Sequence, residues 1–198
     1  MKIDMANLSP QDIHLFWGSA LVPRPVALIS TIGKDGVYNA APFSAVTSVC
    51  NKPPIICVSI GLRQGQKKDT LVNIEHSGDF VINIMNESFI KPVVQASANY
   101  APGVDEIKEA GLTAIACDKV KSPRIDEAQV NLECRLVQTM HFGEGQELRH
   151  VIFGEVVLAV VKDEVLVAGR IDPSRLGAVG RIGDGVYCCT KDIFQMRV

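Results

Sequence analysis

Lys68, Asp69 and Thr70 combine a cation with a hydroxyl group at the start of a helical pattern over residues 68–77, which Gly78 ends. Free backbone N–H groups and the positive end of the dipole favour a phosphate at a helix start. Lys68 would add a full charge there, and Thr70 a hydroxyl donor. The alternative is plain capping of the helix by Asp69 or Thr70, which is the commoner reason for such residues.

Ser59, Ile60 and Gly61 close a second segment, a short apolar run over 55–60 that predicts a buried strand. Hydroxyl and backbone donors become available where such a strand ends. The alternative is an ordinary strand end followed by a glycine turn.

The stretch VYNAAPFS begins as a strand and then departs from strand chemistry. Asn39 is a poor strand former, and Pro42 lacks the N–H group of a sheet ladder and is expected to end it. Ala40 and Ala41 would let a flat ring lie against the backbone, with Asn39 and Ser44 bonding its edges. A bulged edge strand is the alternative. Together the three segments suit one planar ligand that carries a phosphate.

Strands dominate the elements that must position these segments. The predicted helices run from Ser9 to about Phe16 or Trp17 and over 68–77, 86–99 and 104–110; the predicted strands cover 25–32, 37–44, 55–60, 80–85, 130–141, 148–161, 164–168 and 186–189. The turn at 34–36 ends in glycine, which supplies the positive φ of a hairpin turn, so 25–32 and 37–44 pair. The pattern favours a mainly β, antiparallel barrel or sandwich with inserted helices, forming a single domain over 1–198.

The composition and the missing motifs exclude several classes of protein. A net charge of −2, with no basic run beyond Lys67-Lys68, gives no support to nucleic-acid or membrane-surface binding. No apolar run approaches the roughly 20 residues of a spanning helix, and no signal-peptide pattern opens the chain, so a cytoplasmic protein is expected. The chain lacks a strand-linked GxGxxG, a GxxxxGK[ST], an HExxH and a GxSxG.

The six cysteines and four histidines have no metal-ligand or disulfide spacing, so buried thiols are expected and no metal site is predicted. Cys188 and Cys189 could be redox active, but adjacent residues of a strand point to opposite faces. Their role stays open.

The order of the motifs resembles a known family. The matching stretches are PRPVALISTIGKDGVYNAAPFSAVTSVCNKPPIICVSIG, KDTLVNIEHSGDFVIN, VDEIKEAGLT, VNLECRL, HVIFGEVV and VGRIGDGVY, which run from about Arg24 to about Tyr187. They resemble the flavin reductase-like family of FMN-binding split barrels, most of all its flavoredoxin-type members. The resemblance implies a six-stranded, Greek-key-type split barrel that forms a homodimer, with FMN near the subunit interface.

The resemblance also implies which residues contact the cofactor. The flavin would be contacted by Arg24, Ser30, Thr31, Asn39, Ala40, Ala41 and Ser44, and its ribityl phosphate would be held by Ser59, Ile60, Gly61, Lys68, Asp69 and Thr70. The implied function is an oxidoreductase that passes electrons from NAD(P)H or a protein donor to an acceptor through bound FMN. Two alternatives remain: an electron carrier without a small-molecule substrate, and a flavin-storing protein.

His150 is the candidate catalytic side chain on the nicotinamide side. Family members that use NADH carry an Asp-His pair just before this strand, whereas Arg149 precedes the histidine here. The substitution argues against simple NADH-dependent flavin reduction, and it would suit a phosphorylated or acidic partner. An ordinary structural histidine is the alternative. Tyr100 and Arg181 are further candidates for the substrate side.

Overall fold

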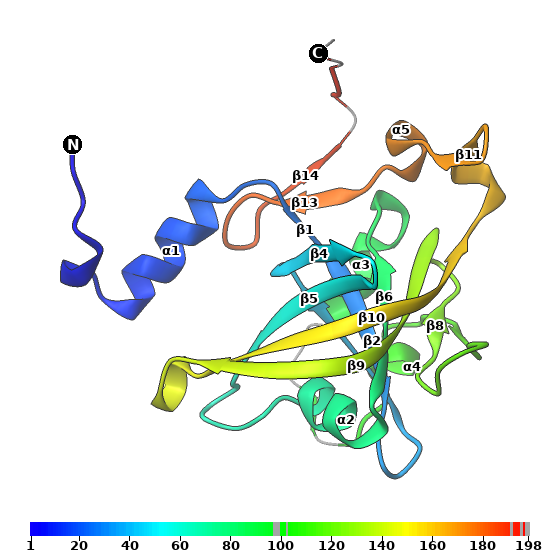
Figure 1. Cartoon of the computed structure of the whole chain (residues 1–198), viewed down its shortest axis with the longest axis horizontal. Coiled ribbons are helices and arrows are strands. Elements are labelled where there is room, and N and C mark those ends of the chain that lie inside the picture. Colours follow the sequence, from blue (N-terminus) through cyan, green and yellow to red (C-terminus); the bar gives the residue numbers. More distant parts are fainter. Residues whose placement is uncertain (97–99, 102, 191, 195, 197–198) are drawn as a thin grey trace.

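A curled, antiparallel, seven-stranded sheet forms the body of the protein in the computed structural model, which describes residues 1–96, 100, 101, 103–190, 192–194 and 196 (Figure 1). In sheet order the strands are β3 (Tyr38–Phe43), β2 (Ala27–Ile32), β6 (Asp79–Ile84), β9 (Val130–Phe142), β10 (Arg149–Val161), β5 (Pro54–Gly61) and β4 (Val46–Asn51). The mainly β antiparallel fold class is confirmed. The sheet holds one strand more than the six that the resemblance implies.

The sheet curls into a barrel because its two outermost strands are consecutive in the chain. Ser44 and Ala45 alone separate β3 from β4, although these strands stand at opposite ends of the hydrogen-bonding order. The Ser59 N–H donates to the Ala45 carbonyl at 2.9 Å, which ties the joint to β5. The barrel is therefore closed at this joint, and a split barrel results.

Pro42 does not end the ladder, so that prediction was wrong. It pairs with Leu28 inside β3, and the ladder continues to Phe43, opposite Ala27. Because β3 has a strand partner on one side only, a residue without an N–H group can be accommodated there. The predicted hairpin turn is confirmed: Gly33 N–H donates to the Val37 carbonyl at 2.8 Å.

Two groups of apolar side chains fill the two faces of the sheet. Inside the barrel, Ile29, Phe80 and Ile152 pack with Leu71 and Ile74 of α2 (Asp69–Ser77). A second group, which includes Leu28, Met85, Phe89, Ile107 and Ile125, lies under the short helical segments η2 (Glu87–Phe89), α3 (Ile90–Ala96) and α4 (Glu106–Glu109). β2 and β6 are therefore buried on both faces along most of their length.

Helix α2 has the predicted end but not the predicted start. Gly78 adopts the left-handed conformation, with φ of 73°, and terminates the helix. Lys68 occupies the N-cap position, and no side chain makes a capping hydrogen bond there. Capping by Asp69 or Thr70 is therefore wrong, because the Thr70 hydroxyl donates to Asn39 instead.

The remaining elements lie around the barrel. They are η1 (Met5–Asn7), α1 (Pro10–Ala20), β1 (Arg24–Pro25), β7 (Ala114–Ile115), β8 (Arg124–Ile125), η3 (Gly145–Glu147), η4 (Asp163–Val165), β11 (Leu166–Val167), β12 (Arg170–Ile171), α5 (Pro173–Leu176), β13 (Val179–Arg181) and β14 (Tyr187–Cys189). β1, β13 and β14 form a separate three-stranded sheet. Helix α1 projects from the body with the N-terminal segment (Figure 1).

Several predicted boundaries need correction. Helix α1 continues beyond Trp17 to Ala20, and the predicted strand over 164–168 contains a turn of 3-10 helix before the two residues of β11. The predicted helix over 104–110 is helical only from Glu106 to Glu109. The helix expected over 86–99 is split between η2 and α3, and its positions 97–99 lie outside the described residues. No helix in the described part of the chain is long and apolar enough to cross a membrane.

Candidate functional site

The three segments singled out in the sequence meet near the barrel joint. Ser44 lies in the joint, and the neighbouring Ala45 accepts the hydrogen bond from Ser59 of β5. Lys68, at the start of α2, places its ammonium 5.4 Å from the centroid of the Phe43 ring. The ends of β3, β5 and the loop before α2 therefore share one region of the surface.

Arg63, Lys68 and Arg149 form a cation cluster in this region. The pKa of Lys68 lies below its ordinary value, first because the ammonium is half-buried and then because Arg63 and Arg149 repel its charge. The Arg149 guanidinium packs on Gly61, where an added Cβ would lie 2.8 Å from Nη1. This concentration of positive charge can attract an anion.

A pocket of about 250 Å³ opens beside the cluster. Its lining residues are Arg63, Gln64, Gln66, Lys67, Lys68, Asp69 and Tyr100. Lys67 forms an ion pair with Glu75 at 2.8 Å, whereas within the described residues neither Arg63 nor Lys68 forms one. The Tyr100 hydroxyl donates to the Gln95 carbonyl at 3.3 Å. The predicted substrate-side tyrosine thus lies in the wall of this pocket.

The start of α2 adds backbone donors to the same pocket. The Lys68 carbonyl accepts hydrogen bonds from the N–H groups of Leu71 and Val72, at 2.9 and 3.1 Å. The N–H groups of Asp69 and Thr70 precede these bonds, and no side chain caps them. An anion at this position would gain both donors and the positive end of the helix dipole.

Thr31, Asn39 and Thr70 direct their side chains into a buried hydrogen-bonded network. Asn39 Oδ1 accepts from the hydroxyls of Thr70 at 2.9 Å and Thr31 at 3.3 Å. Thr31 accepts from Asn73 at 3.0 Å, and Asn39 Nδ2 donates to Glu106 Oε1 at 2.8 Å. The network joins the β2–β3 hairpin to α2 and α4. The side chains of Thr31 and Asn39, predicted to contact the flavin, and of Thr70, predicted to hold its phosphate, therefore take part in the packing of the hairpin on α2.

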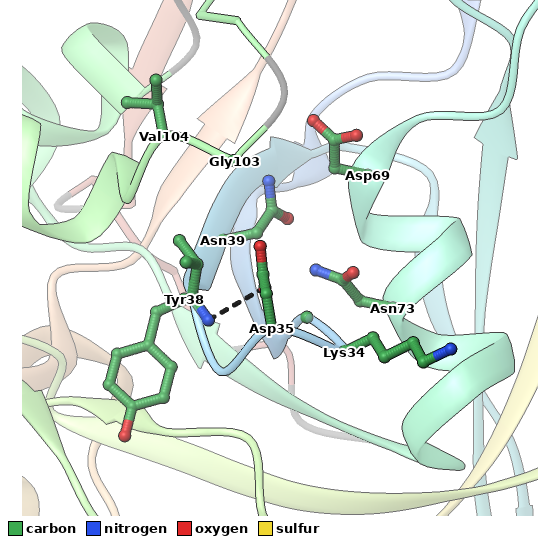
Figure 2. Close-up of a pocket in the computed structure, with 10 residues that line it drawn as sticks. Lys34, Asp35, Tyr38, Asn39, Asp69, Asn73, Gly103 and Val104 are labelled. Carbon is green, nitrogen blue, oxygen red and sulfur yellow. Dashed lines mark hydrogen bonds between the residues drawn. The ribbon is translucent and has the colours of Figure 1, made fainter.

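Asn73 and Glu106 are the members of this network that the sequence did not reveal. The pKa of the Glu106 carboxyl is raised by burial, an effect that the Asn39 hydrogen bond opposes and the charge of Asp69 reinforces. Figure 2 shows Asn39, Asp69 and Asn73 at a pocket of about 320 Å³ between the hairpin turn and α2. Asp69 also lines the pocket of the cation cluster, so the two cavities share this residue.

Four further predicted contacts differ in exposure. Ser30 is buried and donates to the Pro123 carbonyl at 2.5 Å, and Ala40 and Ile60 are buried in the core. The side chains of these three residues lie away from the surface. Ala41 is on the opposite face of β3 from Ala40 and is partly buried.

A pocket of about 400 Å³ lies on the other side of Phe43. Its lining residues are Val26, Pro42, Phe43, Ser44, Val94, Arg181, Asp184, Gly185 and Tyr187. Arg181 donates to the Gly183 carbonyl at 2.9 Å and pairs with Asp184 at 2.8 Å. Aromatic and apolar walls with one arginine suit a planar ligand that has a polar edge.

Arg24 lies next to this pocket, opposite Arg181 in the β1–β13 pair. It lines a small neighbouring cavity with Arg181, and among the described residues its buried Nε has no hydrogen-bond partner. The structure thus brings Arg24 and Arg181 together.

His150 is almost fully buried, with 2% of its surface exposed. Its side chain shares a face with Ile60, and its ring meets the edge of His141 at a centroid distance of 4.7 Å. Burial lowers the pKa of His150, and the charges of His141 and Lys67 lower it further. Arg149 lies on the opposite face of β10 from His150, with the other members of the cation cluster. Within the described residues, both ring nitrogens of His150 are buried without a hydrogen-bond partner.

The chain is similar to known proteins in its sequence and in its structure. The family model for the flavin reductase like domain matches residues 19–172. An uncharacterized protein from Aquifex aeolicus is 36% identical over 169 residues, which are 84% of each chain. The structure of nitrilotriacetate monooxygenase component B from Bacillus cereus is 30% identical, covers 99% of this chain and 98% of its own, and superposes with a TM-score of 0.95.

Flavoredoxin of Desulfovibrio vulgaris shares the fold at 20% identity, with a TM-score of 0.77 over 99% of this chain and 97% of its own. The family match spans most of the chain, and both solved structures superpose on nearly its whole length. The chain therefore belongs to the flavin reductase-like family of split-barrel proteins.

Proposed function

We propose that this chain is an FMN-dependent oxidoreductase that passes electrons between NAD(P)H or a protein donor and an acceptor. The observation that supports this most is the cation cluster of Arg63, Lys68 and Arg149 beside the uncapped start of α2. A phosphate-bearing ring system needs such an anion site next to a wall on which a ring can lie. The pocket beyond Phe43 supplies that wall.

The residues present fit a flavin mononucleotide. Lys68 and the N–H groups of Asp69 and Thr70 would hold the phosphate, and Ser59 and Gly61 lie between that anion site and the barrel joint. When bound, the flavin would supply the two-electron chemistry, while the protein binds it, orients it and limits the access of water. The apolar side chains among the lining of the larger pocket, such as Val26, Pro42 and Phe43, would contact one ring face.

Two candidate functions differ in the electron donor that reduces the flavin. His150, the candidate on the nicotinamide side, is buried, and Arg149 presents a cation where NADH-using relatives would carry an acid. This favours an electron carrier with a protein donor as the second candidate function. A flavin-storing protein would share the binding site and differ only in turnover.

Anaerobic reduction distinguishes these functions. Purified protein is expected to be yellow and to release one FMN per subunit on denaturation; colourless protein that binds no added FMN would refute the proposal. Mixing with NADH, NADPH or a reduced ferredoxin in a stopped-flow spectrometer then identifies the donor. Bleaching of the flavin by NADH or NADPH within seconds would support the oxidoreductase. Bleaching by reduced ferredoxin alone would support the electron carrier. Slow bleaching by every donor would support the storage protein.

We also propose that the protein is a cytoplasmic homodimer with the flavin near the subunit interface. Met140, Phe142 and Val151 lie on the outward face of β9 and β10, where Met140 and Phe142 are 40% and 55% exposed. An apolar sheet face of this kind is typical of an interface.

A further inference from the structure

The guanidinium of Arg149 lies in space left by the missing side chain of Gly61. Arg149 pairs with Gly61 across the β5–β10 ladder, and its guanidinium takes the space that a side chain at 61 would need. An added Cβ at Gly61 would lie 2.8 Å from Nη1 and 3.1 Å from Cζ. The absence of a side chain at 61 thus allows the guanidinium to lie flat on the end of β5.

The two other cations approach the same strand end from the chain that follows it. Arg63 lies two residues beyond Gly61 in a tight turn, where it exchanges backbone hydrogen bonds with Gln66 at 2.8 and 2.9 Å. Lys68 follows the turn and lies over Phe43. After burial, the charges of Arg63 and Arg149 lower the pKa of Lys68, so both arginines lie within electrostatic reach of its ammonium.

The carboxylates around the cluster leave part of its charge uncompensated. Asp69 lies in the same pocket, and Glu147 pairs with Arg149 at 3.2 Å. The Glu147 side chain is 56% exposed, so this ion pair is weak and can be exchanged for a stronger one. A terminal phosphate carries about −1.5 to −2 charges at pH 7 and three acceptor oxygens, which is a better match to three cations than one exposed carboxylate.

We propose that Arg149 leaves Glu147 and binds the terminal phosphate of the flavin, so that the cluster selects FMN over FAD and riboflavin. The inference rests on the proposed function and assigns its specificity to one residue. FMN ends in a phosphate monoester that three cations can surround. Riboflavin has no phosphate, and in FAD an adenylate group is joined to that phosphate, which lowers its charge and fills the space where the cations meet.

Titration of the flavin-free protein with FMN, FAD and riboflavin, followed by flavin fluorescence, tests the inference. The wild-type protein is expected to bind FMN at least about tenfold more tightly than the other two ligands. Arg149→Gln should weaken FMN about ten- to hundredfold and riboflavin less than about twofold. Arg149→Lys should recover part of the loss, and Glu147→Gln should tighten FMN a few-fold because it removes the competing acceptor.

Arg175→Gln is the matched control, since Arg175 is exposed on α5 outside the cluster and should leave all three affinities unchanged. Equal weakening of FMN and riboflavin by Arg149→Gln would show that Arg149 only supports the strand end and would overturn the inference. Equal affinity of the wild-type protein for FMN and FAD would overturn it too, while leaving flavin binding intact. A wild-type protein that binds none of the three flavins would instead refute the proposed function.

Discussion

Gly61 has a role that only a close approach of two elements can explain, because its φ is not in the left-handed region. We predict that Gly61→Ala displaces the Arg149 guanidinium and weakens FMN about five- to fiftyfold, as expected for a lost charge-assisted hydrogen bond. In an Arg149→Gln background the same change should cost little more. A double-mutant cycle of FMN dissociation constants measures this coupling, and strictly additive losses would contradict the contact.

Glu106 carries a second prediction at the scale of one residue. Its pKa in the folded protein is raised above the ordinary value of about 4.3, so the folded state binds the proton more tightly than the unfolded state. The stability that this proton contributes is complete below about pH 4.3 and is lost as the pH rises through the folded pKa.

Glu106→Gln replaces the carboxyl by a neutral amide, so the variant does not lose this stability as the pH rises. We expect the free energy of unfolding of the variant, relative to wild type, to increase as the pH rises from 4 to 8. Urea denaturation at each pH measures the difference. A variant that becomes relatively less stable with rising pH would show that the network requires the ionised carboxylate.

At the scale of elements, α2 lacks the stability that a capping side chain would add at its start. Lys68 occupies the N-cap position without capping the helix. We predict that Lys68→Ser is more stable than Lys68→Ala by about 1 kcal/mol, because serine is a good N-cap and alanine is not. Both variants should weaken FMN more than riboflavin. Chemical denaturation and flavin titration of the pair check the two effects separately, and equal weakening of both ligands would refute the phosphate role of Lys68.

The elements predicted correctly from the sequence are those whose boundaries depend on a few neighbouring residues. The hairpin turn ends in a glycine with φ of 82°, and α2 ends in another at Gly78, so both boundaries follow from a few neighbouring residues. β4 escaped prediction because its sequence, VTSVCN, is largely exposed and lacks an alternating apolar pattern. Pro42 was misjudged because its tolerance depends on β3 being an outer strand, which is a property of the sheet.

The candidate site was predictable only in part, for the same reason. Local motifs located Ser59, Gly61 and Lys68, which the fold brings to one region of the surface. The partner of Asn39 could not be found in this way, because Glu106 is 67 residues away in the chain and pairs through the packing of α4 on β3. The buried positions of Ser30 and His150 likewise depend on which face of each strand the barrel encloses.

At the scale of the whole molecule, the outward face of β9 and β10 predicts the assembly. Met140 lies opposite Val151 on this face. We expect wild type to be a dimer and Met140→Asp to raise the dimer dissociation constant by more than about a hundredfold, since a symmetric interface counts each lost contact twice. Sedimentation equilibrium measures the dissociation constant of the dimer. Val167→Asp, on the exposed β11, is the control, and a variant at Met140 that stays dimeric would place the interface elsewhere.

The two-residue joint between β3 and β4 has a consequence for handling the protein in concentrated solution. The outermost strands of an open sheet present unpaired backbone groups that can recruit strands from other chains and start aggregation. Here Ser44 and Ala45 hold these strands together at one end, and α2, α3 and α4 pack against β3. Loosening the joint with an inserted Gly-Ser pair would free both edges at once, and intermolecular β-structure should then form at protein concentrations that the wild type tolerates.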